Sequence, residues 1–438
     1  MTAIRTLGVL DPNFAWDGTR LYEGADFARE GLPAQLRGSA TYVGGTVASQ
    51  RRRILRDPLG INKLFWTMDG RGAVVLAARP RTLVDEGYAL RDIRAIPRGS
   101  VIDVDPLEDE AAEHSLVPPE WAKPSANIGI EGAGRRIRTT LDRYLNELAS
   151  RHPSAQTFVC LSGGLDSSGV AVLVREHFPA AVAVSFDLER PGPPSDDRVV
   201  AARLARELGM PLLEATVSVE ELLAPLDTVL VEGIDWRDFN VHAALVNAAL
   251  AAAIADAAAG APAIVFTGDL ANEFLVDYQP ERYRGTTYYE LPRLQPSALR
   301  TSLVRGLDAC HREVGVFGAW GLPVVQPYAV AVDSYLALPE DFLRVPDRKA
   351  RLCRAIFGEL VPPYVYSRPK ARAQVGSTDV EGSVLGLCVD RGIDASSLRS
   401  RFGELHRVDE PADLDRFIRA GRYRASAPVL SARASEPV

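Results

Sequence analysis

The feature of this sequence that most constrains its fold is the segment SGGLDSS at residues 162–168. It follows the apolar run TFVCL at 157–161, typical of a buried strand, and it precedes a stretch with helical spacing of apolar residues. Glycines let backbone N–H groups turn toward an anion, and a helix N-terminus adds partial positive charge. This order therefore predicts a phosphate-binding loop. The loop lacks the ending of a Walker loop, which excludes that class.

Each residue of the loop is a candidate phosphate ligand: Ser162, Gly163, Gly164, Leu165, Asp166, Ser167 and Ser168. The serine hydroxyls can donate hydrogen bonds to phosphate oxygens. The carboxylate of Asp166 would repel phosphate unless a cation lies between them, and a bridging Mg²⁺ removes that conflict. The alternative is a Gly-Ser turn in which Asp166 caps the helix, but seven specified residues in this context rarely arise by chance.

Strands and helices alternate around this loop. Apolar runs at 181–186 and 263–268 predict two further strands. Periodic apolar residues predict helices at 130–149, 167–176, 198–208 (followed by Gly209), 217–231 and 240–258. This order is typical of a doubly wound parallel sheet, an α/β fold that binds ligands at the carboxyl ends of its strands. From about residue 290 onward the pattern is mainly helical.

The first part of the chain has a different pattern. Residues 1–115 contain short runs rich in β-branched and aromatic residues, separated by Gly, Asp and Pro: ATYVGG, RILRD, KLFWTM, AVVLAAR and SVIDVD. These runs predict a β-rich N-terminal domain. The polar, proline-rich residues 116–127 predict a linker, residues 128–425 a second domain with a helical C-terminal part, and residues 426–438 a disordered tail.

The composition excludes several classes of protein. A net charge of −7 disfavours a nucleic-acid surface, which needs clustered Lys and Arg. The four cysteines have long, irregular spacings, which excludes a zinc or CxxC pattern and indicates reduced thiols. The apolar stretch 241–263 is interrupted by polar residues, so a buried helix is expected rather than a membrane span. The expected location is cytoplasmic, because no targeting segment is found. The sequence does not decide the oligomeric state, and a homodimer is one possibility.

The loop SGGLDSS resembles the PP-loop of ATP pyrophosphatases, most closely that of the asparagine synthetase and β-lactam synthetase family. Further segments are similar to motifs of this family: RDPLGI at 56–61 with LFW at 64–66, IPRG at 96–99, FTGDLANE at 266–273, AWGL at 319–322, QPY at 326–328, RPK at 368–370 and QVGS at 374–377. The resemblance covers nearly the whole chain. It implies an α+β N-terminal domain, a degenerate glutaminase-like sandwich of the Ntn-hydrolase type, followed by the α/β synthetase domain.

By this resemblance the protein uses ATP and Mg²⁺ to convert a small-molecule carboxylic acid into an acyl-adenylate, which a small-molecule amine then attacks. Lys370 is the expected catalytic cation, because a fixed ammonium stabilises the charge that grows on the α-phosphate. Asp166 and Asn272 are the expected Mg²⁺ ligands. Adenine is expected against the strand ends, at Leu161, Val184, Ser185, Phe186, Thr267 and Gly268.

The resemblance also implies substrate-reading residues. Those expected near the acyl substrate or the pyrophosphate are Asp235, Arg237, Asp238, His242 and Arg368. The first four are equally well explained as capping or ion-pairing residues. Asp196 and Asp197 match an acidic position of the family, and helix capping is their alternative role.

Three positions depart from the family pattern. The family's glutaminase uses a cysteine as residue 2, whereas this chain has Thr2 and no cysteine before Cys160, so the amine is not expected to come from glutamine. Asn272 replaces an aspartate; its amide oxygen can bind Mg²⁺ without charge, and Glu273 next to it can substitute. Asp269 occupies a position that faces the acyl-adenylate in the family. Its carboxylate can accept a proton from the amine, or cap a helix instead.

The leading expectation is therefore an AMP-forming carbon–nitrogen ligase of secondary metabolism. Ammonia-dependent amidation and intramolecular lactam closure stay open within this class. A PP-loop enzyme that acts on tRNA is disfavoured by the acidic charge and the missing CxxC. A non-catalytic relic is favoured by Asn272 and disfavoured by the intact loop and Lys370.

Overall fold

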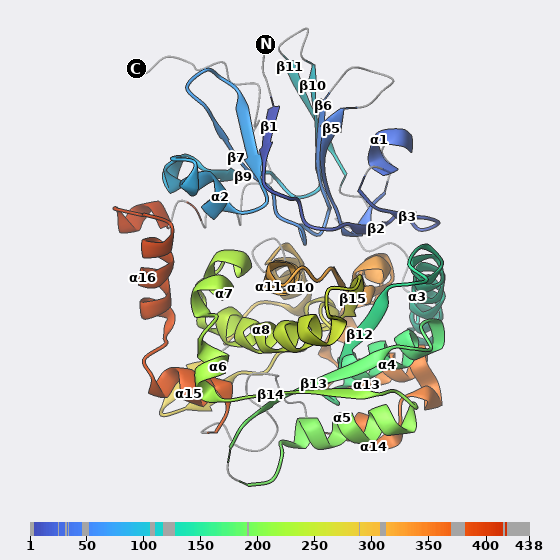
Figure 1. The fold of residues 1–438 in the computed structure, drawn as a ribbon. Coiled ribbons are helices and arrows are strands. Elements are labelled where there is room, and N and C mark those ends of the chain that lie inside the picture. Colours follow the sequence, from blue (N-terminus) through green and yellow to red (C-terminus); the bar gives the residue numbers. More distant parts are fainter. Residues whose placement is uncertain are drawn as a thin grey trace. The chain divides into compact units, whose positions relative to one another are not determined.

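The computed structural model describes residues 4–24, 26–30, 33, 35–45, 52–105, 110–116, 128–190, 192–288, 290–306, 312–368, 382–414 and 417. The chain folds as two compact units (Figure 1). Unit 1 comprises Met1–Pro119, Arg305–His311 and Ser400–Val438, and unit 2 comprises Glu120–Val304 and Arg312–Arg399. The predicted linker beyond Leu116 and the predicted disordered tail lie outside the described residues.

Unit 1 contains three small sheets. The first has the order β1 (Ile4–Leu7), β8 (Val74–Ala77), β7 (Phe65–Met68), β9 (Arg94–Ala95). The second has the order β11 (Glu110–Ser115), β10 (Ser100–Asp105), β6 (Arg52–Arg56), β5 (Thr41–Gly45). The third has the order β3 (Leu21–Tyr22), β2 (Phe14–Trp16), β4 (Arg37–Ser39), and the helices are α1 (Asp26–Glu30), α2 (Pro80–Asp85) and the 3₁₀ turn η1 (Leu90–Asp92). The five runs predicted as strands are confirmed as β5, β6, β7, β8 and β10.

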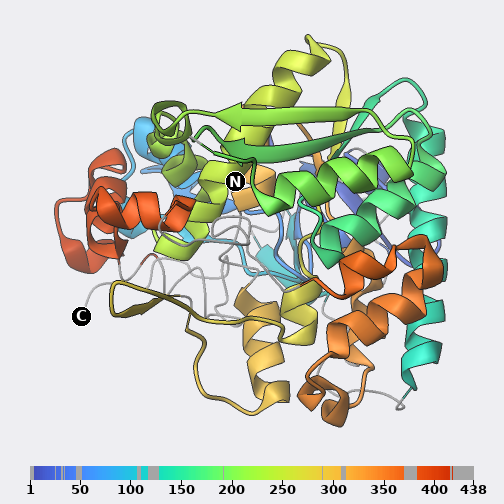
Figure 2. The same cartoon turned by 90° about the horizontal axis from the view of Figure 1, so that it is seen from below.

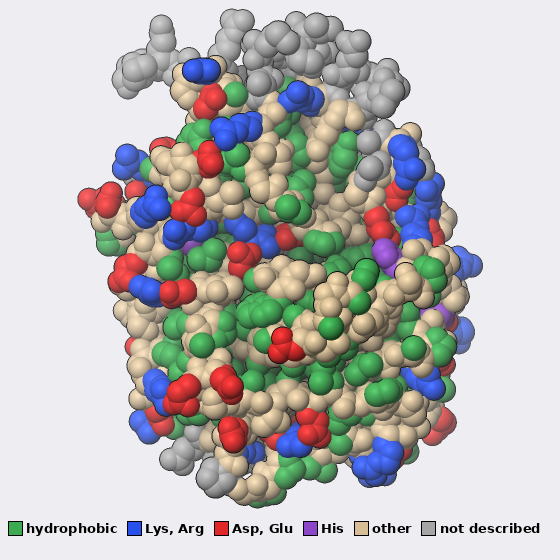
Figure 3. Space-filling model, viewed as in Figure 1, with side chains coloured by type: hydrophobic (Ala, Val, Ile, Leu, Met, Phe, Trp, Pro, Cys, Tyr) green, Lys and Arg blue, Asp and Glu red, His purple; other side chains and the backbone are tan. Residues whose placement is uncertain are grey.

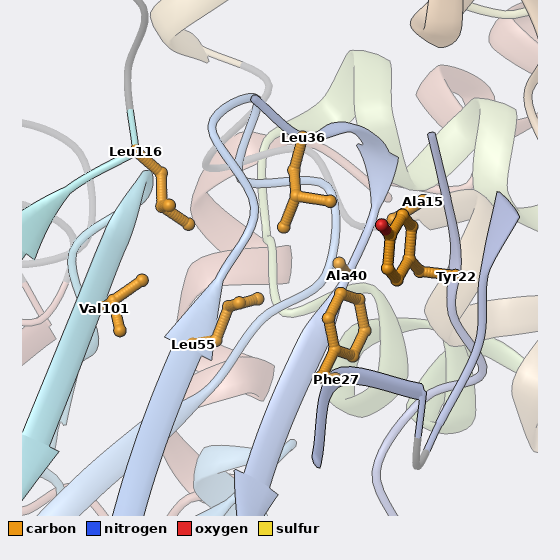
Figure 4. Close-up of a cluster of buried hydrophobic side chains, with 8 residues drawn as sticks. All are labelled: Ala15, Tyr22, Phe27, Leu36, Ala40, Leu55, Val101 and Leu116. Atoms are coloured by element: carbon orange, nitrogen blue, oxygen red, sulfur yellow. The ribbon is translucent and has the colours of Figure 1, made fainter. Parts of the chain in front are cut away.

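The second of these sheets has an apolar cluster on each face. One cluster comprises Ala15, Tyr22, Phe27, Leu36, Ala40, Leu55, Val101 and Leu116 (Figure 4). Ile54 and Ile102, next in sequence to two of these residues, belong to a different cluster with Trp66 and Leu76 of the first sheet. Successive side chains of a strand point to opposite faces, so the two larger sheets pack as a sandwich. That this sandwich is of the Ntn-hydrolase type stays a prediction.

The segment RDPLGI at 56–61 has a structural role in unit 1. The buried guanidinium of Arg56 donates hydrogen bonds to the carbonyls of Asn62 (2.8 Å), Ile96 (2.5 Å) and Gly60 (3.0 Å). Asp57 accepts hydrogen bonds from the backbone N–H groups of Ile61 and Asn62, both at 3.1 Å. Burial raises the pKa of the Asp57 carboxyl to about 6. This pair therefore ties the 56–61 turn to the IPRG turn at 96–99.

Unit 2 is built on a parallel sheet of five strands. Their order is β14 (Leu212–Val217), β13 (Val182–Leu188), β12 (Gln156–Cys160), β15 (Ala263–Phe266), β18 (Val324–Val325). The helices α5 (Asp196–Glu207) and α8 (Asp238–Ala258) lie on opposite sides of this sheet (Figures 1 and 2). The predicted α/β fold with a parallel sheet is confirmed.

The remaining elements of unit 2 are mainly helical. They are α3 (Ile130–Arg151), α4 (Leu165–His177), α6 (Val219–Leu223), α7 (Leu226–Gly233), α9 (Ala271–Leu275), the hairpin β16 (Glu281–Tyr283) and β17 (Thr286–Tyr288), α11 (Arg312–Ala319), η4 (Pro327–Ala331), α12 (Val332–Leu336), η5 (Glu340–Arg344), α13 (Arg348–Phe357), η6 (Gly358–Leu360), α14 (Pro363–Tyr366) and α15 (Val384–Asp390). Helices α10 (Pro296–Gly306) and α16 (Ala395–Leu405) each have residues in both units.

One predicted helix is wrong. The stretch 217–231 was expected to form a single helix, but β14 ends at Val217 and two helices, α6 and α7, follow it. Pro225 lies between them, and proline cannot donate the backbone hydrogen bond that a continuous helix needs. The segment LLEATV forms a strand because its neighbour β13 supplies a backbone ladder. Sequence periodicity does not reveal that partner.

The apolar stretch near residue 250 forms a core helix. Among the described residues, Asn240–Ala258 is the one helix long and apolar enough to cross a membrane, and 67% of its most apolar window is buried inside the structure. This burial agrees with the predicted buried helix. On the face shown in Figure 3, basic and acidic side chains are intermixed rather than separated by sign. The absence of membrane and nucleic-acid partners stays a prediction.

Close packing of α3 on α13 depends on a glycine. A Cβ atom added at Gly134 would lie 2.6 Å from the backbone of Ala355. We expect Gly134→Ala to lower the free energy of unfolding by about 1–3 kcal/mol, because the helices would have to separate. Chemical unfolding measures this. Gly132→Ala is the matched control on the same helix, since the nearest atom to its added Cβ is Ile128 Cβ at 3.9 Å. Equal stability of the two variants would contradict the prediction.

Candidate nucleotide and acyl-transfer site

The loop at 162–168 connects β12 to α4 and is held by its own serines. Ser162 Oγ lies 3.1 Å from Ser167 Oγ, and the Gly164 N–H donates to Ser162 Oγ at 3.3 Å. Gly163 has φ +70°, and an added Cβ would lie 2.6 Å from Val200 of α5. Gly164, not Asp166, is the helix N-cap, so the capping alternative for Asp166 is wrong. The loop has the strand–loop–helix context that a phosphate cradle requires.

Two residues far along the sequence, Tyr328 and Arg368, donate hydrogen bonds to backbone carbonyls of this loop. The Tyr328 hydroxyl donates to the Asp166 carbonyl oxygen at 3.0 Å. The guanidinium of Arg368 donates to the Ser162 carbonyl oxygen at 3.1 Å and forms an ion pair with Asp197. Arg368 therefore anchors the loop, and its expected role toward the pyrophosphate or a substrate carboxylate stays a prediction. Ser195, not Asp196 or Asp197, is the side-chain cap of α5.

A second loop, at the end of β15, lies directly against the phosphate loop. An added Cβ at Gly268 would be 2.7 Å from the backbone nitrogen of Ser167. The register of the neighbouring strands β13, β12 and β15 places Val184 within β13 level with Cys160 at the end of β12. The predicted adenine-binding residues therefore lie at the ends of β12 and β15 and beside them on β13: Leu161, Val184, Ser185, Phe186, Thr267 and Gly268. Of these, Ser185 and Thr267 have buried hydroxyls without a hydrogen-bond partner. Such open polar atoms are suited to a polar ligand edge.

The structure places a lysine that the sequence reading missed at the centre of this site. Lys349 Nζ forms an ion pair with Asp166, donates to Asn272 Oδ1 at 2.8 Å and lies 3.6 Å from Asp277 Oδ2. Burial alone would lower the pKa of Lys349, but Asp166 and Asp277 outweigh it and raise that pKa. A sequence signal existed, because Lys349 shares the apolar face of α13 with Leu352, Cys353, Ile356 and Phe357.

The oxygens around Lys349 also fit the expected metal. Asp166 Oδ1 is buried without a partner, while Lys349 holds Asp166 Oδ2 and the Asn272 amide oxygen. Protein Mg²⁺ sites commonly use one or two such oxygens together with substrate phosphates. Asp166 and Asn272 are therefore the residues that would hold Mg²⁺, and the ion would neutralise phosphate charge there. The alternative ligand, Glu273, accepts a hydrogen bond from Tyr278 through Oε1, but its Oε2 is buried without a partner, so Glu273 remains an alternative.

Another group with metal-ligand spacing lies on α3 and α4. Ligand atoms of Asp142, Glu176 and His177 lie within 4.8 Å of one another. Arg138 forms ion pairs with both carboxylates of this group. The guanidinium of Arg138 offsets one of the two negative charges and bonds both carboxylates, so the arrangement is best described as a surface ion-pair network.

Asp269 belongs to a second polar network, beside the first. Its carboxylate accepts a hydrogen bond from Arg312 Nη2 at 3.2 Å, and the N-cap of α9 is Leu270, so the capping alternative for Asp269 is wrong. Arg312 also forms an ion pair with the buried Glu313 through Nε, and Nη1 donates to Asn240 Oδ1 at 3.2 Å. The sequence reading identified neither Arg312 nor Glu313, which lie 43 and 44 positions further along the chain.

Some residues of the segment 235–242 belong to this polar network, and His242 belongs to the hydrophobic core. Asp235 accepts hydrogen bonds from Arg237 Nε at 2.8 Å and from Asn240 Nδ2 at 2.5 Å, so Arg237 and Asp235 connect to Arg312 through Asn240. His242 is fully buried, with Nε2 3.4 Å from the Ile393 carbonyl oxygen, and burial lowers its pKa. His242 therefore points into the core and not toward a substrate. Asp238 lies in the first turn of α8.

The predicted catalytic cation, Lys370, lies outside the described residues, as does the QVGS segment at 374–377. Thr2 also lies outside them. The described site therefore comprises the phosphate loop, the strand ends, the group around Lys349 and the network around Arg312.

Burial of Glu313 makes stability depend on pH. Burial raises the pKa of its carboxyl from 4.5 to about 8, with Arg312 opposing and Asp269 reinforcing the shift. Between these values the folded chain keeps a proton that the unfolded chain has lost, so the free energy of unfolding falls as pH rises, by at most about 1.4 kcal/mol per pH unit.

In Glu313→Gln, we expect the free energy of unfolding to fall less steeply as pH rises, because glutamine does not titrate. Unfolding by denaturant, measured below and above the window from 4.5 to about 8, tests this. Glu220→Gln is the control, because Glu220 is exposed. A slope that is unchanged in Glu313→Gln would contradict the prediction.

With this geometry established, comparison with known proteins identifies the domain. The asparagine synthase family model matches residues 149–315. Residues 149–315 are an asparagine synthase domain. The match contains the phosphate loop, Asp269, Asn272 and Arg312, whereas Lys349 lies beyond it. For residues 149–315, this match confirms the family recognised from SGGLDSS.

Three solved structures are similar to parts of the chain. NH₃-dependent NAD synthetase from Campylobacter jejuni has 18% identity and a TM-score of 0.24, over 39% of this chain and 73% of that one. NMN synthetase from Francisella tularensis has 15% identity and a TM-score of 0.31, over 66% and 92%. Glutamine-dependent NAD⁺ synthetase from Acinetobacter baumannii has 14% identity and a TM-score of 0.26, over 48% and 36%. Similarity at these TM-scores supports no assignment. No protein of curated function matches the sequence.

Proposed function

We propose that this protein is an AMP-forming ligase that adenylates a carboxylic acid and transfers the acyl group to an amine not supplied by glutamine. The observation that carries the proposal is the position of Lys349 between Asp166 of the phosphate loop and Asn272. A buried cation between two oxygen ligands, beside a glycine-rich loop at a helix N-terminus, is suited to a polyphosphate with its magnesium ion.

In the first step, a carboxylate oxygen of the acid attacks the α-phosphorus of ATP. The bond to the β-phosphate oxygen breaks, and pyrophosphate is released into the loop. Lys349 and the loop N–H groups stabilise the charge of this leaving group. Lys370 is expected to do the same for the α-phosphate. Mg²⁺, held by Asp166 and Asn272, would supply further neutralisation of the phosphate charge.

In the second step, the amine nitrogen attacks the acyl carbonyl, the bond between the carbonyl carbon and the AMP oxygen breaks, and AMP leaves. The nitrogen must lose a proton, and Asp269 is the proposed acceptor. Its side chain is 28% exposed, so it is reachable, and it follows β15 next to the phosphate loop. A carboxylate is suited to a cationic external amine.

The source of the amine follows from residue 2. A glutaminase of this family needs a cysteine there, and Thr2 carries no thiol. Unit 1 then serves as a scaffold that keeps the glutaminase-like sandwich without its chemistry. Ammonium, a second small molecule or an amino group of the acid itself remains as the nucleophile. We favour an external amine in natural-product biosynthesis, because Asp269 offers a charged acceptor.

Acid-dependent exchange of labelled pyrophosphate into ATP, with Mg²⁺ and mixtures of amino and keto acids, tests the first step. Hydroxylamine then traps each acyl-adenylate as a hydroxamate and identifies the acid. With at least one acid, we expect exchange of pyrophosphate into ATP and formation of AMP. Release of ADP, or no AMP with any acid, would refute the proposal. A scaffold without activity would bind no ATP.

A further inference from the structure

The polar network around Asp269 contains Arg312, whose three guanidinium nitrogens each lie against an acceptor oxygen. Arg312 pairs through Nε with Glu313, donates through Nη1 to Asn240 and donates through Nη2 to Asp269. Its side chain is 22% exposed, so it lies at the edge of the site and not on the open surface. An arginine held at three points has one orientation, because the guanidinium is planar and rigid.

The partners of Arg312 come from three elements that the sequence separates widely. Asn240 lies on α8, Glu313 on α11, and Asp269 on the loop between β15 and α9. This last loop follows β15 and contains no strand of its own. Leu270 adopts φ +82°, a conformation that non-glycine residues rarely take, and tertiary contacts must maintain it. Arg312 is one such contact, on the residue next to Leu270.

We propose that Arg312 is a positioning residue that holds the Asp269 carboxylate toward the acyl-adenylate, where it accepts the amine proton. This rests on the proposed function. Arg312 is not a catalytic residue, because its nitrogens are engaged by Glu313, Asn240 and Asp269.

Three buried acidic groups of the described residues lie close enough to Asp269 to be affected by its charge. Glu313 on α11 and Glu273 on α9 are buried carboxyls whose pKa values burial raises, with Asp269 adding to both shifts. Cys160 at the end of β12 is a buried thiol whose pKa burial raises, again with Asp269 adding to the shift. Arg312 lowers the pKa of Glu313 and of Glu273. Arg312 is thus the neighbour of Asp269 that favours negative charge in this group.

The test separates the two half-reactions. In Arg312→Gln, we expect pyrophosphate exchange to stay within about threefold of wild type, since Asp269 does not act in adenylation. Amide formation should fall by about 100-fold, the usual effect of a small misplacement of a reacting group. Arg312→Lys keeps the positive charge but loses the planar guanidinium. Its rate of amide formation should therefore lie between the rates of wild type and Arg312→Gln. Arg284→Gln is the matched control, because Arg284, in the turn between β16 and β17, forms an ion pair with Asp390 away from this network.

A double-mutant cycle distinguishes positioning from general stability. In the Asp269→Asn background, Arg312→Gln should cost amide formation nothing further, because the group that it positions is already inactive. Full additivity of the two effects would overturn the inference. An equal loss of exchange and amide formation in Arg312→Gln and in Arg312→Lys would also overturn it. Lack of exchange in the wild-type protein would refute the proposed function instead, so the two failures are distinguishable.

Discussion

Lys349→Met is expected to abolish ATP-dependent adenylation and to lower the free energy of unfolding. Its ammonium lies between Asp166, Asp277 and the amide oxygen of Asn272. Removing it leaves the largely buried Asp166 without its cation, a kind of loss that costs up to about 3–5 kcal/mol, whereas Asp277 keeps its contact with Arg348 at 3.8 Å. Adenylation should fall by about 10²–10³-fold or more, since the pyrophosphate leaving group loses a fixed charge.

Pyrophosphate exchange and denaturant unfolding together measure this prediction. Because the Asp166 carboxylate destabilises the folded chain when it is ionised without its ammonium partner, the loss of stability in Lys349→Met should become smaller as pH falls. Arg354→Met is the matched control on the same helix, α13. Arg354 stacks over the Tyr366 ring at 4.7 Å, and its loss should leave exchange near the wild-type rate. Wild-type exchange in Lys349→Met would exclude a phosphate-binding role for this lysine.

Asp269→Asn is expected to separate the two chemical steps. Amide formation with an amine should fall by about 10²–10⁴-fold, because an amide side chain cannot take the proton. Adenylation should be nearly unchanged, as the phosphate loop and Lys349 remain. Asparagine keeps the size and the acceptor oxygen that faces Arg312, so a large effect would report lost proton transfer rather than lost packing.

Hydroxylamine provides the internal check for this variant. It is uncharged at neutral pH and needs no base to become a nucleophile, so hydroxamate formation by Asp269→Asn should stay close to wild type. Asp256→Asn, an exposed substitution near the end of α8, is the control for the chemical change itself. A parallel loss of hydroxamate and amide would place Asp269 in adenylation and contradict its assignment as proton acceptor.

Predictions that rest on local pattern agree with the structure. The strand before SGGLDSS, the helix after it and the five strand runs of the first 115 residues are all present. Each depends on periodicity and turn residues within one short window. The failure at 217–231 also has a local cause, Pro225, whereas the strand LLEATV needed a neighbouring strand to be recognised.

The sequence by itself determined the phosphate loop, the α/β order and the family, because seven specified residues in a strand–loop–helix context leave few alternatives. Tertiary structure alone decided which residues complete the site. Lys349 and Arg312 reach Asp166 and Asp269 across 183 and 43 positions. Sequence spacing carries no information on such contacts, because they arise only when separate helices come together in the folded chain. Burial then determines their charge states, and burial is a property of the folded chain.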